Sequence, residues 1–344
     1  MNKTLYINGS FLASSRLSGV QRYGIEITRQ LIKDYSRKNK NLIIVANKVS
    51  SDSLKREFSS YLKIYPSNKI IFEQIILPWI SKGNKLLSLA NSGPVFHFNH
   101  YFVLHDTLVY DFPKSFTKKF RIFYKFLWFL ISKTAKHFFT VSEFSKNQIS
   151  KHLNLKIANI SIASNGYEHL ENIKSDDKII YSEYILFVGS FTDHKNFNLL
   201  VELYNKNPEK YPKLIMAGGF NKKVFNNTEI NSKNIIFIQD FTDEVLVNLY
   251  KNCLAVVFPS KFEGFGIPLL ECIYFNKPII CSDIPVFREI GNDYPNYFDL
   301  ENIEELKSYL KIIKNGSELR KGDKEKILQK YSWKNSLKSI TNKI

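Results

Sequence analysis

Short apolar runs alternate with longer amphipathic segments along the whole chain. This alternation predicts parallel β-sheets covered by helices, because each strand then returns through a helical crossover. In the first half the predicted strands are Leu5–Asn8, Leu42–Ala46, Val95–Phe98, Phe138–Val141 and Ile160–Ala163. In the second half they are Ile185–Val188, Leu214–Ala217, Ile235–Ile238, Ala255–Phe258, Ile279–Cys281 and Tyr297–Phe298.

The strands of the second half are each followed within two residues by Gly, Ser or Asp. A doubly wound α/β sheet holds its ligand groups at such carboxyl ends. A polar stretch, Tyr167 to Glu183, separates the two strand sets and is interpreted as a linker. We therefore expect an α/β chain with one domain over 1–170, a second over 171–325, and a helical tail over 326–344 anchored by Trp333.

Composition supports a folded protein with two ordinary cores. The chain has 344 residues, of which 44% are hydrophobic and 24% charged, which excludes a disordered class. The longest apolar run, Phe126–Ile131, is far too short to span a bilayer, and the N-terminus lacks the features of a signal peptide. Cys253, Cys272 and Cys281 lie in apolar segments, so we expect reduced thiols and a cytoplasmic location.

Positive charge is concentrated in the first half. Residues 1–175 hold 26 Lys and Arg against 10 Asp and Glu, whereas the remainder holds 23 against 22. The whole chain carries +17. A basic half points to a nucleic acid, an anionic membrane or an acidic substrate.

The segment from Glu263 to Glu271 contains the most specific pattern. A strand ends just before it, a turn with two glycines follows, and a helix is predicted to begin near Gly266–Pro268. Backbone N–H groups at a helix start suit an anion or a sugar hydroxyl, and carboxylates suit paired hydroxyls. Two solvated glutamates would be the simpler interpretation, but the glycines and proline favour a built turn with close backbone approach.

This motif resembles that of family 4 retaining glycosyltransferases of the GT-B fold. Further segments occur in the same order as in that family: Ser18–Tyr23, His105-Asp106, Val141–Ser145, Asn165-Gly166, Phe187–Ser190 with Lys195-Asn196, and Ser282–Pro285 with Phe287–Glu289. The resemblance implies two Rossmann-like doubly wound domains facing each other across a cleft. It also implies that the last helix crosses back to the first domain.

The resemblance assigns roles by position. Lys195 and the N–H groups at Gly19 would meet the donor diphosphate, Glu263 and His105 the transferred sugar, and Glu271 the ribose. Of these, His105, Lys195 and Glu263 would be catalytic. The remaining donor-binding positions would be Ser190, Gly219, Phe265, Gly266 and Ile267.

Many family members carry Arg where Ser190 and His194 stand, so Lys195 would be the main cation. His97 and His100 have His-x-x-His spacing, but a strand is a poor platform for a metal site. We therefore expect neither metal nor cofactor.

The segment Phe112–Phe139 contains many cations and aromatic residues and no acidic residue. At helical spacing Phe116, Phe120, Phe123, Leu127 and Leu130 share one face, which we expect to pack on the core. The opposite face gathers cations with an aromatic edge, a pattern typical of a helix lying in a membrane interface. A merely solvated basic face is the alternative. The residues expected to meet acceptor or membrane are Lys114, Lys118, Arg121, Lys125 and Trp128.

Together these features predict a metal-independent, retaining glycosyltransferase of bacterial surface-polysaccharide synthesis. The first domain would receive the acceptor and the second would bind the nucleotide sugar, with GDP-mannose as first candidate. The acceptor would be a lipid-linked saccharide, so we expect a cytoplasmic protein peripheral to the inner face of the membrane. The alternatives are a nucleotide-sugar epimerase or hydrolase of the same fold and a nucleic-acid-binding protein, although no nucleic-acid-binding motif is present.

Overall fold

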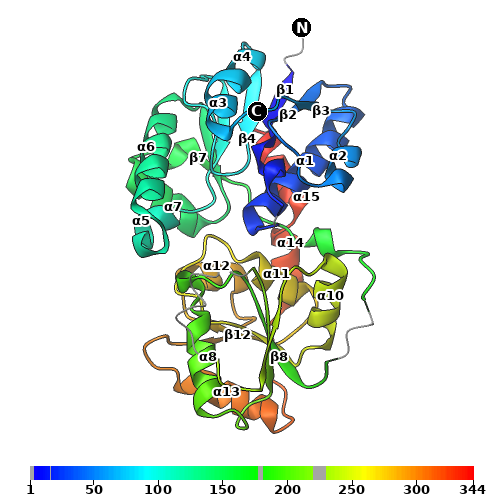
Figure 1. Cartoon of the computed structure of the whole chain (residues 1–344), viewed down its shortest axis with the longest axis vertical. Helices are drawn as coiled ribbons and strands as arrows, with labels where there is room; N and C mark the ends of the chain where they lie inside the picture. The colour runs from blue at the N-terminus through cyan, green and yellow to red at the C-terminus, as the bar shows by residue number, and fades with distance from the viewer. Residues whose placement is uncertain (1–3, 16, 177–180, 220–229) are drawn as a thin grey trace. The chain divides into compact units, whose positions relative to one another are not determined.

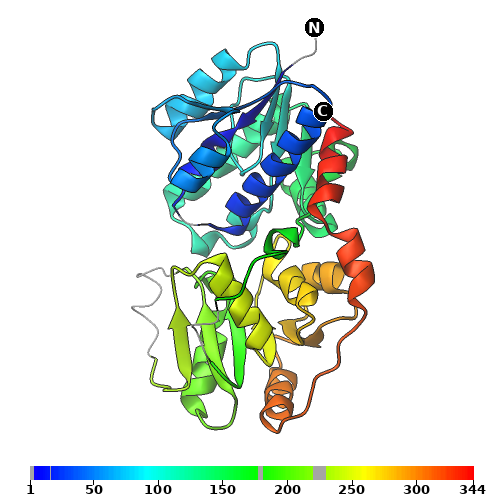
Figure 2. The same ribbon diagram turned by 90° about the vertical axis from the view of Figure 1, so that its right-hand side faces the viewer.

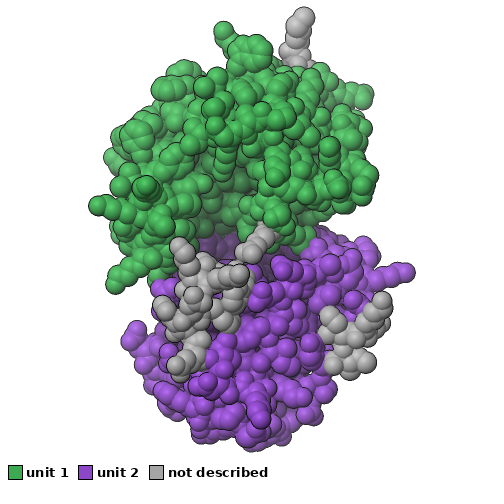
Figure 3. Space-filling model, in the orientation of Figure 1, with its two compact units in different colours: residues 1–165, 332–344 green, residues 166–331 purple. Residues whose placement is uncertain are grey.

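The computed structural model describes residues 4–15, 17–176, 181–219 and 230–344. They form two compact units, shown in different colours in Figure 3. Unit 1 comprises Met1–Asn165 with Ser332–Ile344, and unit 2 comprises Gly166–Tyr331.

Unit 1 is built on a parallel sheet. Within the described residues it has seven strands in the order β3-β2-β1-β4-β5-β6-β7. Ile44 and Val45 are neighbours on β2, point to opposite faces and are both fully buried, as in a sheet covered on both faces. The strands are β1 (Leu5–Asn8), β2 (Leu42–Ala46), β3 (Leu62–Ile64), β4 (Lys85–Ser88), β5 (His100–Val103), β6 (His137–Thr140) and β7 (Ile160–Ile162).

Helices cover both faces of this sheet. Connections that run towards β3 and those that run towards β7 lie on opposite faces, because parallel crossovers are right-handed. Figure 1 shows α1 and α2 on one side and α6 and α7 on the other. The helices are α1 (Gly19–Arg37), α2 (Asp52–Glu57), α3 (Lys69–Ile71), a π-helical turn (Phe72–Ile76), α4 (Leu77–Ile80), α5 (Leu108–Asp111), α6 (Lys118–Thr134), α7 (Glu143–Leu153) and α15 (Trp333–Thr341).

Unit 2 repeats the architecture with a second parallel sheet. Its described strands have the order β10-β9-β8-β11-β12-β13. They are β8 (Tyr184–Val188), β9 (Lys213–Ala217), β10 (Ile235–Ile238), β11 (Ala255–Phe258), β12 (Ile279–Ser282) and β13 (Asn296–Phe298). The helices are α8 (Phe197–Lys206), α10 (Asp243–Asn252), α11 (Ile267–Tyr274), α12 (Pro285–Gly291), α13 (Glu304–Lys314) and α14 (Lys324–Lys330), and Figure 2 shows them from a second direction.

Each predicted strand of unit 2 has its counterpart, but one prediction in unit 1 is wrong. Val95–Phe98 is a loop, and the strand lies further along, at His100–Val103. The loop imitates a strand because Val95 and His97 are buried whereas Phe96 and Phe98 are exposed. Its alternation comes from packing against neighbouring segments rather than from pairing in the sheet.

The division between units also differs from the predicted boundaries at 170/171 and 325/326. Unit 2 begins at Gly166, so the first part of the predicted linker belongs to its folded body, where Leu170 is buried. The tail is two helices rather than one. Tyr331, at the end of α14, donates to the Glu289 carbonyl within unit 2, whereas Trp333 starts α15 and is fully buried in unit 1.

Helix α6 is present as expected, and part of the predicted core face packs on the core, where Leu127 is buried and Phe116 and Leu130 are partly buried. Phe120 and Phe123 are exposed, whereas Leu127, Trp128 and Ile131 are buried. The indole N–H of Trp128 donates to the Asn91 carbonyl at 2.8 Å. Trp128 is therefore a core residue of unit 1, and the prediction that it meets a membrane is wrong. A tryptophan satisfies its N–H when it is buried, which fixes the rotation of the helix.

We expect Trp128→Ala to lower the free energy of unfolding by about 3–5 kcal/mol, because it leaves a cavity and an unpaired carbonyl. Phe129→Ala, at the neighbouring exposed position, is the matched control and should change it by less than about 1 kcal/mol. Urea denaturation of both variants measures the difference. Equal effects would contradict the observed helix orientation.

Candidate active site

The strands β8 and β11 are neighbours in the sheet of unit 2, and the strand order reverses between them. Ligand groups in such sheets gather beyond the carboxyl ends of the strands at this switch point. Lys195 follows β8 in a 3₁₀ turn, and Glu263 follows β11 in the loop before α11. The Lys195 Nζ donates to both carboxylate oxygens of Glu263, each at 2.6 Å.

This ion pair is largely withdrawn from solvent, with side-chain exposures of 17% for Lys195 and 10% for Glu263. The Ser260 hydroxyl donates to Glu263 Oε1 at 2.8 Å, and the Ser282 hydroxyl in turn donates to the Ser260 carbonyl. An ammonium has three N–H donors and a carboxylate about four acceptor positions. The pair can therefore be held in place and still bind a phosphate oxygen and a hydroxyl.

A glycine turn places α11 directly after Glu263. Gly266 is the N-cap of the helix with φ of 93°, in the left-handed region, and a Cβ there would lie 2.9 Å from the Phe287 ring. Only glycine meets both conditions. Phe265 and Ile267 on either side are buried, and Phe265 lies edge-on to Tyr331. Their side chains fix the turn, so the contribution they can make to a ligand is through their backbone.

Glu271 lies within α11 and is also buried. Its Oε1 accepts from His169 Nε2 at 2.8 Å, and its Oε2 accepts from the Tyr250 hydroxyl at 2.7 Å. His169, Tyr250 and Ser260 are not among the residues predicted from the sequence, and Ser282 was named there only within the segment Ser282–Pro285. His169 was overlooked because it falls in the segment interpreted as a linker, where only its buried contact reveals a structural role.

Two further predicted donor-binding positions lie just beyond the carboxyl ends of strands in the same sheet. Ser190, just after β8, and Gly219, just after β9, are exposed. The chain that follows Gly219, residues 220–229, lies outside the described residues. Gly218 is the tighter position, because a Cβ there would lie 1.7 Å from the Gly189 carbonyl oxygen.

His194 does not replace the positive charge of an arginine. Burial, with Lys195 next to it, lowers the pKa of His194 to about 4, so the ring is neutral near pH 7. Lys195 is then the cation that this loop directs towards the carboxyl end of the sheet.

Gly19 and His105 belong to unit 1. Gly19 is exposed at the first position of α1, where the side-chain oxygen of Gln21 accepts from the Ser18 N–H at 3.3 Å. His105 follows β5 and is 5% exposed, with Nε2 2.9 Å from the Leu89 carbonyl and its ring edge-on to Tyr23. Burial lowers the pKa of His105 to about 4, so it is a neutral ring whose Nε2–H donates to the carbonyl.

The predicted cations of the α6 region are present at the surface to different degrees. Lys114 and Lys118 are exposed, and Arg121 and Lys125 are half-buried. The Lys125 Nζ lies 4.4 Å from the centre of the Tyr110 ring.

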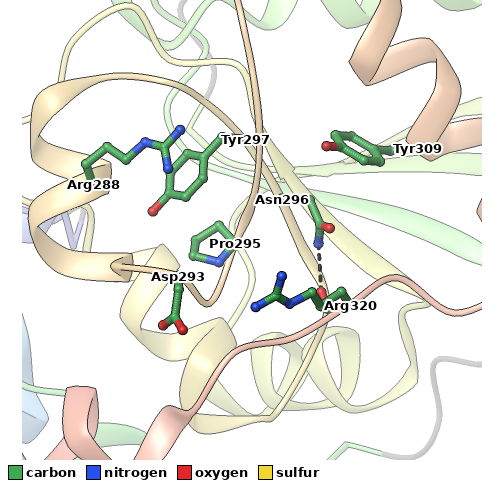
Figure 4. Close-up of a pocket in the computed structure, with 7 residues that line it drawn as sticks. All are labelled: Arg288, Asp293, Pro295, Asn296, Tyr297, Tyr309 and Arg320. Carbon is green, nitrogen blue, oxygen red and sulfur yellow. Dashed lines mark hydrogen bonds between the residues drawn. The ribbon is translucent and has the colours of Figure 1, made fainter.

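A separate cavity of about 280 Å³ lies beside the edge strand β13 and includes none of the predicted residues. Figure 4 shows Arg288 next to Tyr297, with Asn296 donating to the Arg320 carbonyl. The Arg288 guanidinium is paired with Asp283, an interaction that lowers the pKa of that carboxyl, so its charge is compensated. Among the described residues, no three His, Cys, Asp or Glu side chains gather as a metal site.

The chain is similar to known sugar-transferring proteins. A family model described as "Glycosyl transferases group 1" matches residues 171–328. The O-antigen chain mannosyltransferase RfbU of Salmonella typhimurium is 30% identical over 247 residues, which are 70% of this chain and 67% of that protein. The O-antigen chain mannosyltransferase B of Escherichia coli is 26% identical over 52% of this chain and 51% of its own length.

Solved structures match almost the whole chain. The structure of Anabaena HepE in complex with UDP and glucose has a TM-score of 0.73 at 12% identity and covers 99% of both chains. That of WaaG, a glycosyltransferase involved in lipopolysaccharide biosynthesis, has a TM-score of 0.65 at 13% identity and covers 97% of this chain and 94% of its own. At these identities the likeness shows the fold alone, and it confirms the GT-B fold expected from the sequence.

We expect His169→Ala to destabilise unit 2 by about 3 kcal/mol, because it removes a hydrogen-bonding partner from the buried Glu271 carboxylate. His152→Ala is the control, since His152 pairs with Asp111 at a partly exposed site and should cost about 1 kcal/mol or less. Urea denaturation measures both. A His169 variant as stable as the control would show that Glu271 does not depend on this contact.

Three histidines of unit 1 should make the protein sensitive to mild acid. Burial lowers the pKa of all three, His97, His100 and His105. The pKa of His100 falls to about 3 and that of His105 to about 4. Below about pH 6.5 these histidines take up protons in the unfolded chain but not in the folded protein. The free energy of unfolding therefore decreases as the pH is lowered. For His105 the loss between pH 7 and pH 5 is about 2 kcal/mol. His105→Asn should show a smaller decline in urea midpoints over this range, and an identical decline would refute the assignment.

Proposed function

The chain belongs to the group 1 glycosyl transferases, and from this premise we propose that it transfers mannose from a nucleotide-activated donor, GDP-mannose, to a saccharide of bacterial surface polysaccharide. Two relatives named as O-antigen chain mannosyltransferases support the sugar and the polysaccharide class. The observation that carries the proposal is the Lys195–Glu263 ion pair at the switch point of unit 2, inside the segment that the family model matches.

We propose that Lys195 stabilises the leaving diphosphate. Charge on the phosphate oxygens grows as the bond to the anomeric carbon breaks, and a fixed ammonium in a largely buried site stabilises that charge without reorganisation. Its contact with Glu263 holds Nζ beyond the carboxyl end of β8. The neutral His194 leaves this role to Lys195.

Glu263 and Glu271 receive different parts of the donor in this scheme. Glu263, in the loop before α11, accepts from hydroxyls of the transferred sugar, and Glu271, within α11, accepts from the ribose hydroxyls. His169 and Tyr250 orient Glu271 as positioning residues. Ser260 does the same for Glu263.

The reaction retains anomeric configuration by front-face displacement. The acceptor oxygen forms a bond to the anomeric carbon on the side from which the diphosphate leaves. The diphosphate keeps the electron pair of the broken bond, and the acceptor proton passes to a phosphate oxygen. This scheme requires positioning and electrostatic stabilisation but no metal. In unit 1, His105 is proposed to contact the transferred sugar, and the backbone of the Gly19 turn is proposed to contact the diphosphate.

We propose a lipid-linked acceptor because the charge separates sharply between the units. Over the sequence, unit 1 holds 28 Lys and Arg against 8 Asp and Glu, whereas unit 2 holds 21 against 24. An anionic acceptor held at an anionic membrane would favour this imbalance. The protein would then be peripheral to the cytoplasmic face of the membrane. Among the described residues, no helix is both long and apolar enough to cross a bilayer.

The decisive experiment incubates the protein with GDP-mannose, GDP-glucose, UDP-glucose or dTDP-glucose, with and without saccharide acceptors. We expect mannosylated product from GDP-mannose only when acceptor is present, equally with and without EDTA. Lys195→Met should lower kcat about 100-fold or more with a smaller change in KM. Nuclear magnetic resonance of the product gives the anomeric configuration.

Four outcomes would contradict parts of the proposal. Release of free sugar at the same rate without acceptor would identify a hydrolase, and an isomerised nucleotide sugar would identify an epimerase. Activity that EDTA abolishes and added metal restores would exclude the metal-free scheme. Tight, salt-dependent binding to oligonucleotides without any turnover would favour the nucleic-acid alternative.

We expect calorimetric titration with GDP alone to distinguish the roles of Glu271 and Glu263. Glu271→Gln should weaken GDP binding about tenfold, because the amide accepts ribose hydroxyls less well than a carboxylate. Glu263→Gln should leave GDP affinity within about threefold and lower turnover, since its partner is the transferred sugar. Equal losses of GDP affinity in both variants would overturn this division of roles.

A further inference from the structure

The six most exposed large apolar side chains of the described residues lie in three segments of unit 1. Ile75 and Trp79 belong to the α3–α4 region, Phe96 and Phe98 to the loop between β4 and β5, and Ile122 and Phe126 to α6. Their exposures range from 60% to 76%. We call these six residues the apolar platform. Isolated exposed apolar residues are common, but gathered ones mark an interaction surface.

The topology places the three segments on one face of the sheet. The connections from β3 to β4, from β4 to β5 and from β5 to β6 all run in the same direction across the strand order. Right-handed crossovers in one direction lie on one face. Figure 1 shows α3 and α6 on the side opposite to α1 and α2, and Figure 2 shows α1 and α2 nearest the viewer with α6 behind the sheet.

Hydrogen bonds connect the middle segment to both of its neighbours. The Gln74 side chain, in the turn between α3 and α4, donates to the Gly93 carbonyl and accepts from the Val95 N–H, each at 3.0 Å. On the other side, Trp128 of α6 donates to the Asn91 carbonyl, and Val95 packs in the same apolar cluster as Trp128. The loop therefore bridges the two helical regions, with Phe96 and Phe98 directed outwards.

Lysines dominate the exposed charges of the segments around the platform. The sequence from 58 to 105 contains a single acidic residue, Glu73. Glu73 is 3% exposed and accepts hydrogen bonds from Asn8, Ser10 and Ser92, so its charge is directed inwards. Asp106 and Asp111 also lie in the connection from β5 to β6, where Asp106 accepts from the Leu108 N–H and Asp111 contacts Thr107 and His152. Residues 112–142 contain no acidic residue. The exposed cations in these segments include Lys69, Lys82, Lys118, Lys119 and Lys133.

We propose that the apolar platform is the membrane-docking surface of unit 1 and inserts into the interface of an anionic bilayer. Aromatic side chains occupy the boundary between headgroups and acyl chains, and the surrounding lysines meet the anionic headgroups. A second copy of this chain is a poor occupant, because it would bring the same cations against these cations. The biological purpose rests on the proposed function, but the docking surface is defined by unit 1 alone.

Tryptophan fluorescence gives a direct readout. Trp128 and Trp333 are buried, whereas Trp79 is 75% exposed. Vesicles of phosphatidylglycerol and phosphatidylcholine should therefore shift the emission to shorter wavelength, and lipids brominated along the acyl chain should quench it. Trp79→Phe should bind vesicles within about threefold of wild type but lose the shift and the quenching.

Sedimentation with the same vesicles separates the apolar from the electrostatic contribution. The triple change Trp79→Ser, Phe96→Ser and Phe98→Ser should weaken binding at least about 100-fold at both 0.1 M and 0.5 M NaCl. Replacing Lys114, Lys118, Arg121 and Lys125 with Gln should weaken it mainly at 0.1 M. Ile157→Ser with Leu254→Ser, exposed apolar positions outside the platform, is the control and should bind like wild type. Thermal unfolding and GDP binding establish that each variant is folded.

The platform is overturned if the folded triple variant binds vesicles as wild type does, or if wild type does not bind them. A concentration-dependent fluorescence shift without vesicles, matched by a dimer in sedimentation, would identify a second copy as the occupant instead. Vesicle binding needs neither donor nor acceptor, so the two proposals fail separately. If the protein turns over GDP-mannose but does not bind vesicles, only the membrane-docking proposal is wrong. If it binds vesicles but transfers no sugar, only the proposed function is wrong.

Discussion

The direction of each crossover between parallel strands determines which helices and loops lie on each face of the two sheets. Right-handed crossovers send the connections on the two sides of β1 in unit 1, and of β8 in unit 2, to opposite faces of the sheet. At the point of reversal the chain leaves the carboxyl ends uncovered, and there unit 2 places Lys195 and Glu263. The same rule assembles α3, α4, the loop between β4 and β5, and α6 on one face of unit 1. Both proposed surfaces therefore follow from strand order.

Buried charge is costly, and unit 2 contains two instances of it close together in sequence. Glu263 is held by Lys195 and Ser260, and Glu271 by His169 and Tyr250. Hydrophobic replacements would often be as stable or more so, which makes such pairs weak evidence for stability and better evidence for a binding role. The neighbouring His194 remains neutral and adds no charge to the Lys195–Glu263 pair.

The sequence predicted unit 2 better than unit 1 because most of its strands are apolar runs that are largely buried, and a Gly, Ser or Asp follows each of them within two residues. The motif from Glu263 to Glu271 specified its own turn, since Gly266 requires a left-handed backbone. Strands β3 and β4 of unit 1 were not predicted, and two predictions that were made there proved wrong for different reasons. Val95–Phe98 alternates between buried and exposed residues because a loop packs on one side. Trp128 was expected at the surface of α6, because helical spacing alone does not determine which of two apolar stripes packs against the sheet. His169 could not be found, because its partner is more than a hundred residues away.

The break between α14 and α15 affects how the chain can fold during its synthesis. Tyr331 completes unit 2, and two residues later Trp333 enters unit 1, where its ring packs against Tyr23 of α1. Ser336 also donates to the Ser164 carbonyl at the end of the first segment of unit 1. The ribosome must therefore finish unit 2 before it delivers the helix that completes unit 1. A nascent chain emerging in order would hold α1 with one side uncovered while a whole second domain folds behind it.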